Sequence, residues 1–147
     1  MSFSVRQMGA CVAFCLLFAC SGSWALQAIP ATGKITLDGK LIEADWARAP
    51  VFNEFIENTP REKVPAMVRT EVRVLFDHDA LYFGLRAYDP DPSKIVAPFV
   101  RRDKVFGNQD NFVVWVDPTG ARKFAQFFRV NARGILADGV WNEDSGD

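Results

Sequence analysis

The feature that most constrains the fold is the alternation of residue types between Thr70 and Tyr88. The segment TEVRVLF (Thr70–Phe76) places Val72 and Val74 on the side opposite Glu71, a pattern typical of a β-strand with one buried face. LYFGLRAYD resumes the alternation after DHDA, whose residues tolerate turn geometry and hydrogen-bond to their own backbone. The sequence therefore predicts a β-hairpin over this stretch.

Later segments have the same character. NFVVWVD (Asn111–Asp117) and KFAQFFRVN (Lys123–Asn131) flank PTGAR, which supplies the proline and glycine of a turn. ILADGVW (Ile135–Trp141) follows Gly134 and has the composition of a further strand. We expect a second hairpin with one more strand after it.

Only one segment has helical character. LIEADWARA (Leu41–Ala49) carries alanines and a charged face, and Pro50 ends it. Leu41, Trp46 and Ala49 are expected to face the sheet. IENTPREKVPAM (Ile56–Met67) combines prolines with charges and is expected to be an exposed loop. Together these segments predict an all-β antiparallel β-sandwich, jelly-roll-like, with one short helical segment.

The amino-terminal residues 1–25 have the pattern of a signal peptide. Arg6 precedes an apolar stretch from Met8 to Ala19, and Ser23-Trp24-Ala25 is a small-x-small cleavage motif. The apolar stretch is shorter than the roughly 18 residues of a membrane-spanning helix, so a permanent anchor is the less favoured interpretation. The mature domain is then residues 26–147, exported to the periplasm, the cell surface or the extracellular space.

A lipoprotein signal is the alternative. It would end at Cys20, although Phe18 is bulky for such a motif. The 3 cysteines, Cys11, Cys15 and Cys20, all lie in the signal, so the mature domain is expected to contain no disulfide, thiolate metal site or cysteine nucleophile. The core alone must then hold the domain together.

Charge composition argues against polyanionic partners. The chain has 17 Lys and Arg against 18 Asp and Glu, and Arg6 is the one charged residue in the expected signal. A nearly balanced domain is not expected to bind nucleic acid or an anionic membrane surface.

Five motifs occur in a characteristic order: ITLDGKLIEADWARAPVF, TEVRVLFDHDALYFGLRAYDPDPSKI, RRD, DNFVVWVDP and FRVNARGILAD. This order resembles the amino-terminal module of secreted bacterial proteins whose domain is similar to the family 9 carbohydrate-binding modules. The resemblance covers the chain from Ile35 to Asp138. Relatives that contain the RRD and FRVN motifs look like a subgroup. In this subgroup the module precedes a carboxy-terminal region that resembles an outer-membrane barrel.

The resemblance implies a non-catalytic β-sandwich that binds oligo- or polysaccharides and is associated with polysaccharide breakdown. Known members are similar in binding calcium and in holding the sugar between two tryptophan rings. Two features depart from that pattern: one clamp tryptophan comes from a carboxy-terminal segment missing here, and the strand DNFVVWVD has valine where the family often has an acidic residue. VWNEDSGD ends the chain in an acidic stretch directly after a strand. Either that strand is a sheet edge, which acidic residues protect from pairing, or the chain is a fragment, which is the interpretation we favour.

The loop after Phe99 supplies the candidate ligand residues. Arginine offers a planar fork of donors for vicinal hydroxyls, and a nearby carboxylate accepts from the same diol. The predicted rim and stacking residues are Arg102, Asp103, Asn108, Asp110 and Trp141. The alternative is that an Arg–Asp pair merely orders the loop, and that Trp141 is an exposed edge residue.

The other tryptophans and the acidic turns have simpler interpretations. Trp46 and Trp115 lie among apolar residues and are expected to be core. Asp89 and Asp91 in YDPDP are candidate calcium ligands, although turn formation explains them more simply. The lone histidine, His78, is expected to be a solvated turn residue.

No catalytic motif stands out in the sequence, and we expect no enzymatic activity. The first functional hypothesis is a secreted carbohydrate-binding domain. The second is a periplasmic interaction or plug domain for the missing barrel-like region, with strand addition at ILADGVW and no sugar binding. A haem-binding sandwich is a third, with only His78 and Met67 as axial ligands.

Overall fold

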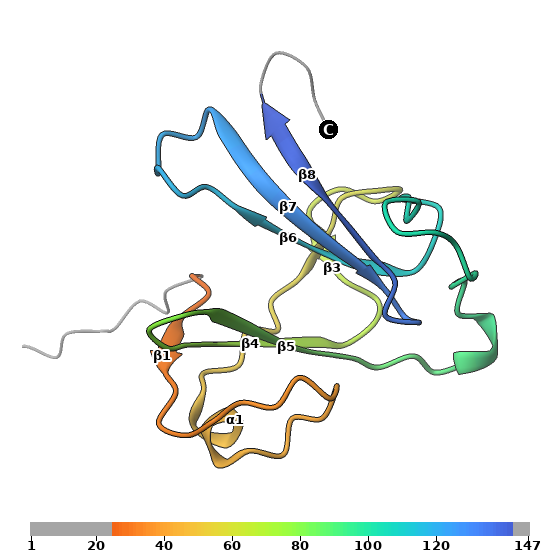
Figure 1. The fold of residues 1–147 in the computed structure, drawn as a ribbon. Coiled ribbons are helices and arrows are strands. Elements are labelled where there is room, and N and C mark those ends of the chain that lie inside the picture. The colour runs from red at the N-terminus through yellow and green to blue at the C-terminus, as the bar shows by residue number, and fades with distance from the viewer. Residues whose placement is uncertain (1–24, 143–147) are drawn as a thin grey trace, which may run out of the picture. The chain divides into compact units, whose positions relative to one another are not determined.

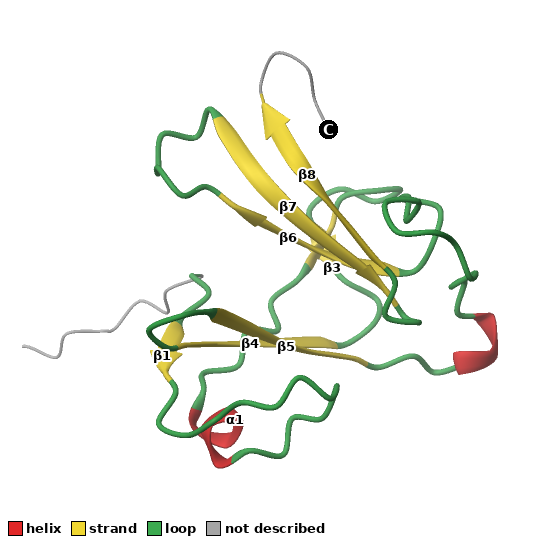
Figure 2. Cartoon of the chain, viewed as in Figure 1, coloured by secondary structure: helices red, strands yellow, loops and turns green. Residues whose placement is uncertain are grey.

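The computed structural model describes residues 25–142, which form eight strands, one α-helix and one 3-10 helix. The expected signal peptide, apart from Ala25, and the acidic residues after Asn142 lie outside this range. The chain divides into two compact units, one ending at Tyr88 and one beginning at Asp89 (Figure 1). Strands and loops make up nearly all of both units (Figure 2), so the all-β prediction is confirmed.

The first unit is built on a three-stranded sheet. Strand β1 (Ala28–Pro30) pairs parallel with β4 (Thr70–Phe76), and β5 (Leu81–Ala87) pairs antiparallel with the other edge of β4. The turn between β4 and β5 is organised by Asp77, whose carboxylate accepts the backbone N–H groups of Asp79 and Ala80 at 2.8 and 2.9 Å. The first predicted hairpin is therefore confirmed.

The prediction of one buried face on β4 is wrong. Val72 and Val74 are 1% and 3% exposed, and on the opposite face Leu75 is 0% and Glu71 6% exposed. As the central strand of its sheet, β4 is buried on both faces. Glu71 tolerates this burial because it forms ion pairs with Arg69 and Arg73.

The helix α1 (Ala44–Arg48) is shorter than predicted. Ala49 adopts an extended conformation because the ring of a following proline disfavours helical geometry. The side chains nevertheless face the sheet as expected, since Trp46 and Ala49 form a buried cluster with Ile35 and Leu75. Leu41 packs against that cluster, and the prediction that Trp46 is core is confirmed.

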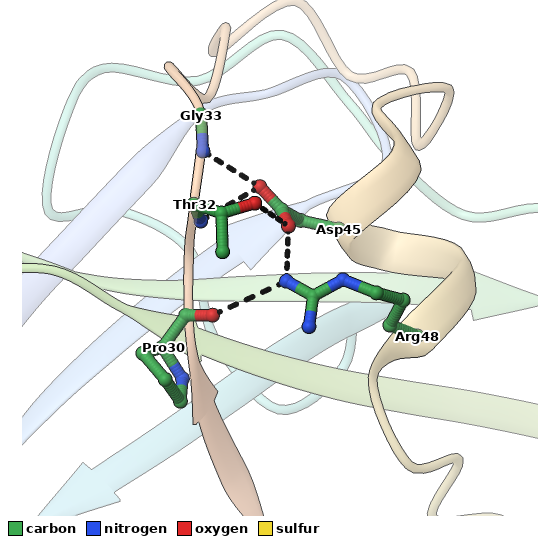
Figure 3. Close-up of polar contacts among 5 residues, drawn as sticks. All are labelled: Pro30, Thr32, Gly33, Asp45 and Arg48. Atoms are coloured by element: carbon green, nitrogen blue, oxygen red, sulfur yellow. Dashed lines mark hydrogen bonds and ion pairs between the residues drawn. The ribbon is translucent and has the colours of Figure 1, made fainter.

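A buried carboxylate ties the end of β1 to α1 (Figure 3). Asp45 is 4% exposed, and its Oδ2 accepts the N–H groups of Thr32 and Gly33, each at 3.0 Å. Its Oδ1 accepts the Thr32 hydroxyl at 2.8 Å and a donor from Arg48, which also donates to the Pro30 carbonyl. The Arg48 guanidinium, then Thr32 and Gly33, hold the pKa of Asp45 far below its usual range.

The segment expected to be an exposed loop contains two short strands. β2 (Ile56–Glu57) pairs antiparallel with β3 (Val64–Pro65). Lys63 closes this hairpin with a positive φ of 61° and donates its N–H to the Glu57 carbonyl at 3.0 Å. The loop prediction is wrong here because the pairing depends on partners within the segment and not on the alternation of residue types.

The second unit holds an antiparallel sheet in the order β6-β7-β8. The 3-10 helix η1 (Pro92–Lys94) comes first, followed by β6 (Asn111–Val116), β7 (Phe124–Asn131) and β8 (Leu136–Asn142). In the β6–β7 turn, Asp117 accepts N–H groups from Thr119, Gly120 and Arg122 at 2.8, 2.9 and 2.6 Å. The second hairpin and the strand after it are confirmed, while the sandwich packing of the sheets stays a prediction. Across residues 25–142, no helix is both long enough and apolar enough to span a membrane.

Candidate functional site

Three aromatic side chains share one face of the β6-β7-β8 sheet. Trp115 of β6 is directly opposite Phe127 of β7, and Trp141 of β8 is opposite Ala125, two residues from Phe127 along β7. Because side chains alternate along a strand, all three rings lie on the same face. We call Trp115, Phe127 and Trp141 the aromatic face.

The rings contact one another in defined geometries. The centroids of Trp115 and Phe127 are 5.2 Å apart with an interplanar angle of 48°. Trp115 and Trp141 meet edge to face, with centroids 6.4 Å apart at 86°, which is a favoured arrangement of aromatic pairs. The two indoles therefore present surfaces at right angles.

Trp115 is not a core residue. Its exposed fraction is 46%, so the prediction from its valine neighbours is wrong. Those neighbours show that β6 is apolar, but they do not show which of its faces is covered. Only the register of β6 with β7, which places Trp115 beside Phe127, reveals an aromatic surface.

A glycine of β8 makes room for the aromatic face. A Cβ atom added to Gly139 would lie 2.7 Å from Cε1 and 2.9 Å from Cζ of Phe127. The Phe127 ring therefore lies across β8, because its neighbour in register has no side chain to displace it.

A loop covers the other half of the same face. Arg129, two residues along β7 from Phe127, donates from Nη1 to the carbonyl of Val105 at 3.0 Å. Asn131, only 3% exposed, donates from Nδ2 to the carbonyl of Pro98 at 3.3 Å. This loop includes Val105, which is 1% exposed, but it does not cover Trp115. The aromatic face thus has a polar border formed by Arg129, whose guanidinium lies 5.4 Å from the Phe127 centroid.

The loop that contains Arg101, Arg102 and Asp103, which we call the RRD loop, is hydrogen-bonded to the edge of β8. Asp103 donates its backbone N–H to the Leu136 carbonyl at 3.0 Å, and its carboxylate accepts the N–H of Asp138 at 3.4 Å. Arg102 forms an ion pair with Asp138 and lies 3.7 Å from the Asp103 carboxylate. A positive φ of 65° at Asp103 turns the chain against this edge.

The predicted ligand residues are therefore only partly brought together. Arg102 and Asp103 are neighbours, but the Arg102 guanidinium is bonded to Asp138. Asp138 and Trp141 are three residues apart on β8, so their side chains point to opposite faces. The structure places Arg102 away from the indole that was expected to stack on the same ligand.

The other two rim residues lie before β6. Asp110 accepts the Val96 N–H at 2.6 Å through its carboxylate and donates its own N–H to the Val96 carbonyl at 2.8 Å. Asn108 is exposed. Asp110 therefore holds two loop segments together.

The acidic turns have partners within their own loops. The Asp91 N–H donates to the Asp89 carboxylate at 2.7 Å, and the Asp91 carboxylate binds Ser93 and lies 3.0 Å from Lys94 Nζ. The Ser93 hydroxyl, then Lys94, lower the pKa of Asp91. Among residues 25–142, no group of three or more His, Cys, Asp and Glu side chains is placed to hold a metal ion.

Neither axial-ligand candidate for haem is enclosed. The His78 side chain is 98% exposed, as expected of a solvated turn residue, and Met67 is 80% exposed. His78 lies 2.9 Å from Asp79 in the β4–β5 turn.

Sequence reasoning found Trp141 but missed Phe127 and Arg129. The sequence offered one signal, because alternation along Phe124–Asn131 places Phe127 and Arg129 on the same face of the strand. The partner of Phe127 follows only from the register. An aromatic surface of this kind can stack on apolar faces of a ligand, and the polar border can orient it.

Comparisons with known protein families, curated proteins and solved structures give no match for this chain. The resemblance to family 9 carbohydrate-binding modules therefore stays a prediction.

Proposed function

We propose that this chain is a non-catalytic carbohydrate-binding domain whose sugar stacks on Trp115 and Trp141. The observation that carries the proposal is the exposed indole of Trp115 meeting Trp141 edge to face at 6.4 Å. A soluble domain gains nothing in stability by leaving a large aromatic ring half in water, and exposed aromatic clusters commonly mark binding sites.

The two indoles suit a pyranose ring. The C–H groups on one face of a sugar are attracted to the π-face of an aromatic ring, as cations and other polarised groups are. One indole would stack on the sugar, and the other, at 86° to it, would bound its side. Arg129 at the polar border supplies hydrogen-bond donors near the hydroxyl groups.

A glycan array followed by isothermal titration calorimetry tests the proposal. We expect Trp115→Ala and Trp141→Ala each to weaken binding of the selected sugar by about tenfold, the loss of one aromatic contact. The matched control is Phe128→Ala, because Phe128 is 51% exposed on the opposite face of the same sheet. The proposal would be contradicted if the two tryptophan variants bound the sugar as tightly as Phe128→Ala. It would also be contradicted if the wild-type chain bound no sugar although its circular dichroism spectrum showed a folded β protein.

The second candidate, an interaction domain, is favoured by a different observation. β8 is the last strand in the order β6-β7-β8 of the described residues. The RRD loop covers its edge only at Leu136 and Asp138, and by alternation the backbone of Val140 faces the same way. Concentration-dependent self-association without sugar binding, measured by light scattering, would favour strand addition at this edge.

A further inference from the structure

One face of the β4–β5 hairpin is apolar at one end and charged at the other. At the apolar end, Leu75 pairs in register with Tyr82, and both contact the core cluster. At the charged end, Glu71 pairs in register with Arg86, and Arg73 pairs with Gly84. The core of the first unit therefore stops partway along this face.

A pocket of about 170 Å³ lies at the charged end. Arg73 and Arg86 line it from the sheet, and Leu41, Ile42 and Ala47 line it from the segment that contains α1. Ile42 is 78% exposed, so part of the apolar wall of the pocket is open to solvent. The walls thus combine guanidinium groups with apolar surface.

The charges around the pocket do not balance. Glu71 forms ion pairs with both Arg69 and Arg73. Arg86 forms no ion pair with any residue in the range 25–142. Glu43 also lines the pocket, but its carboxylate accepts the Thr36 N–H at 3.0 Å, and this bond lowers its pKa. Even with both glutamates ionised, the surroundings retain an excess positive charge.

From this geometry we infer that the pocket beside α1 binds a small monocarboxylate with a compact apolar body. The carboxylate accepts from the guanidinium of Arg86, whose fork of donors matches its two oxygens. The apolar body lies against Leu41, Ile42 and Ala47. A dianion fits less well because the carboxylate of Glu43 repels the second charge. This site shares no residue with the aromatic face and does not depend on the proposed sugar binding.

Titration of the whole chain with benzoate, followed by NMR, tests the inference. We expect benzoate to shift the signals of the Arg86 guanidinium and the Trp46 indole, and Arg86→Gln to weaken binding about tenfold or more, the effect of removing a charged hydrogen bond. Arg101→Gln is the matched control, because it removes the same charge from an exposed position in the other unit. Ala47→Leu, which fills the pocket and keeps a good helix former, should abolish binding without changing the charge.

Other probes separate the two halves of the inference. Benzyl alcohol tests the carboxylate, and its binding as tightly as benzoate would overturn that assignment. Glucuronate, a polar monocarboxylate, tests the need for an apolar body, and inorganic phosphate tests the preference for a single charge. If either binds as tightly as benzoate or more tightly, the corresponding part of the inference is overturned. Shifts that are absent up to the solubility limit of benzoate, or unchanged in Arg86→Gln, would overturn the site itself, whatever the result with sugars.

Discussion

Both three-stranded sheets contain a glycine beneath an aromatic ring, but the two rings differ in what surrounds them. A Cβ atom on Gly84 would lie 2.7 Å from Trp46, and one on Gly139 would lie 2.7 Å from Phe127. Trp46 comes from α1, outside its sheet, and is 4% exposed. Phe127 comes from a strand of the same sheet, and its neighbour Trp115 is 46% exposed.

The difference shows how one local arrangement serves two purposes. A ring supplied by a second layer is covered by that layer, and its burial contributes to stability. A ring supplied by the sheet itself only extends the surface of the sheet. The first unit therefore buries Trp46 in its core, and the second leaves Trp115 partly exposed.

The largest test of this comparison pairs two tryptophans. Trp46→Ala should lower the free energy of unfolding by about 3–5 kcal/mol, the usual cost of a cavity left by a large buried ring. Trp115→Ala should lower it by about 1 kcal/mol or less, because much of the indole is already in water. Urea denaturation followed by circular dichroism measures both, and equal losses would break the comparison.

The two glycines give a test of intermediate size. Gly84→Ala should cost about 1–3 kcal/mol of stability, typical of overpacking, because the enclosed Trp46 ring cannot move aside. Gly139→Ala should cost under about 1 kcal/mol, as at a surface site, because the Phe127 ring can tilt. Denaturation and sugar titration should then show a folding defect in the first variant and a binding defect in the second.

Two carboxylates sharpen the comparison through pH. Asp45 joins segments 13 residues apart, whereas Asp117 bonds within its own turn. Asp45 has a pKa lowered chiefly by Arg48, and Asp117 one lowered chiefly by the Thr119 hydroxyl. A lowered folded-state pKa contributes stability above the unfolded value near 3.8, and that contribution is lost as pH falls through the folded value.

Asp45→Asn should therefore reduce stability at neutral pH and flatten the loss of stability below about pH 5, where unfolded aspartates begin to protonate. Asp117→Asn should also reduce stability at neutral pH, but by a smaller amount, because Asp117 stabilises only one turn. Thermal melts at several pH values provide the measurement, and an acid profile unchanged by Asp45→Asn would contradict this account.

The smallest expected effect is that of Arg102→Ala. Its ion pair with Asp138 is at the surface, with the Arg102 side chain 59% exposed, and such pairs contribute little to stability. If the only role of Arg102 is to hold the loop against β8, the sugar affinity of Arg102→Ala should be close to that of the wild type. A large loss of affinity without unfolding, seen by calorimetry, would instead place Arg102 in the sugar site.

Local patterns predicted the elements well where the chain itself contains the signal. Alternation located β4 and β5, and the Asp-rich and Pro-Gly turns located the hairpin connections. The segment before Pro50 was predicted as a helix, and Trp46 as core. These features depend on residues close together in the sequence, so their physics can be read without knowing the rest of the fold.

Features that depend on distant partners were not predictable in the same way. Trp115 was expected in the core, but its exposure depends on which layer covers that face of β6. The attachment of Asp103 to β8 joins residues more than thirty positions apart, and nothing in the RRD motif indicates its partner.

The sequence by itself determined that this chain is a β protein with hairpins at β4–β5 and β6–β7, a short helix and no cysteine after Cys20. Tertiary structure alone decided which aromatic rings are buried and which remain exposed. The reason is physical: alternation specifies that a strand has two faces, but burial depends on whether another layer covers a given face. That layer covers Trp46 in the first unit, whereas Trp115 remains exposed in the second.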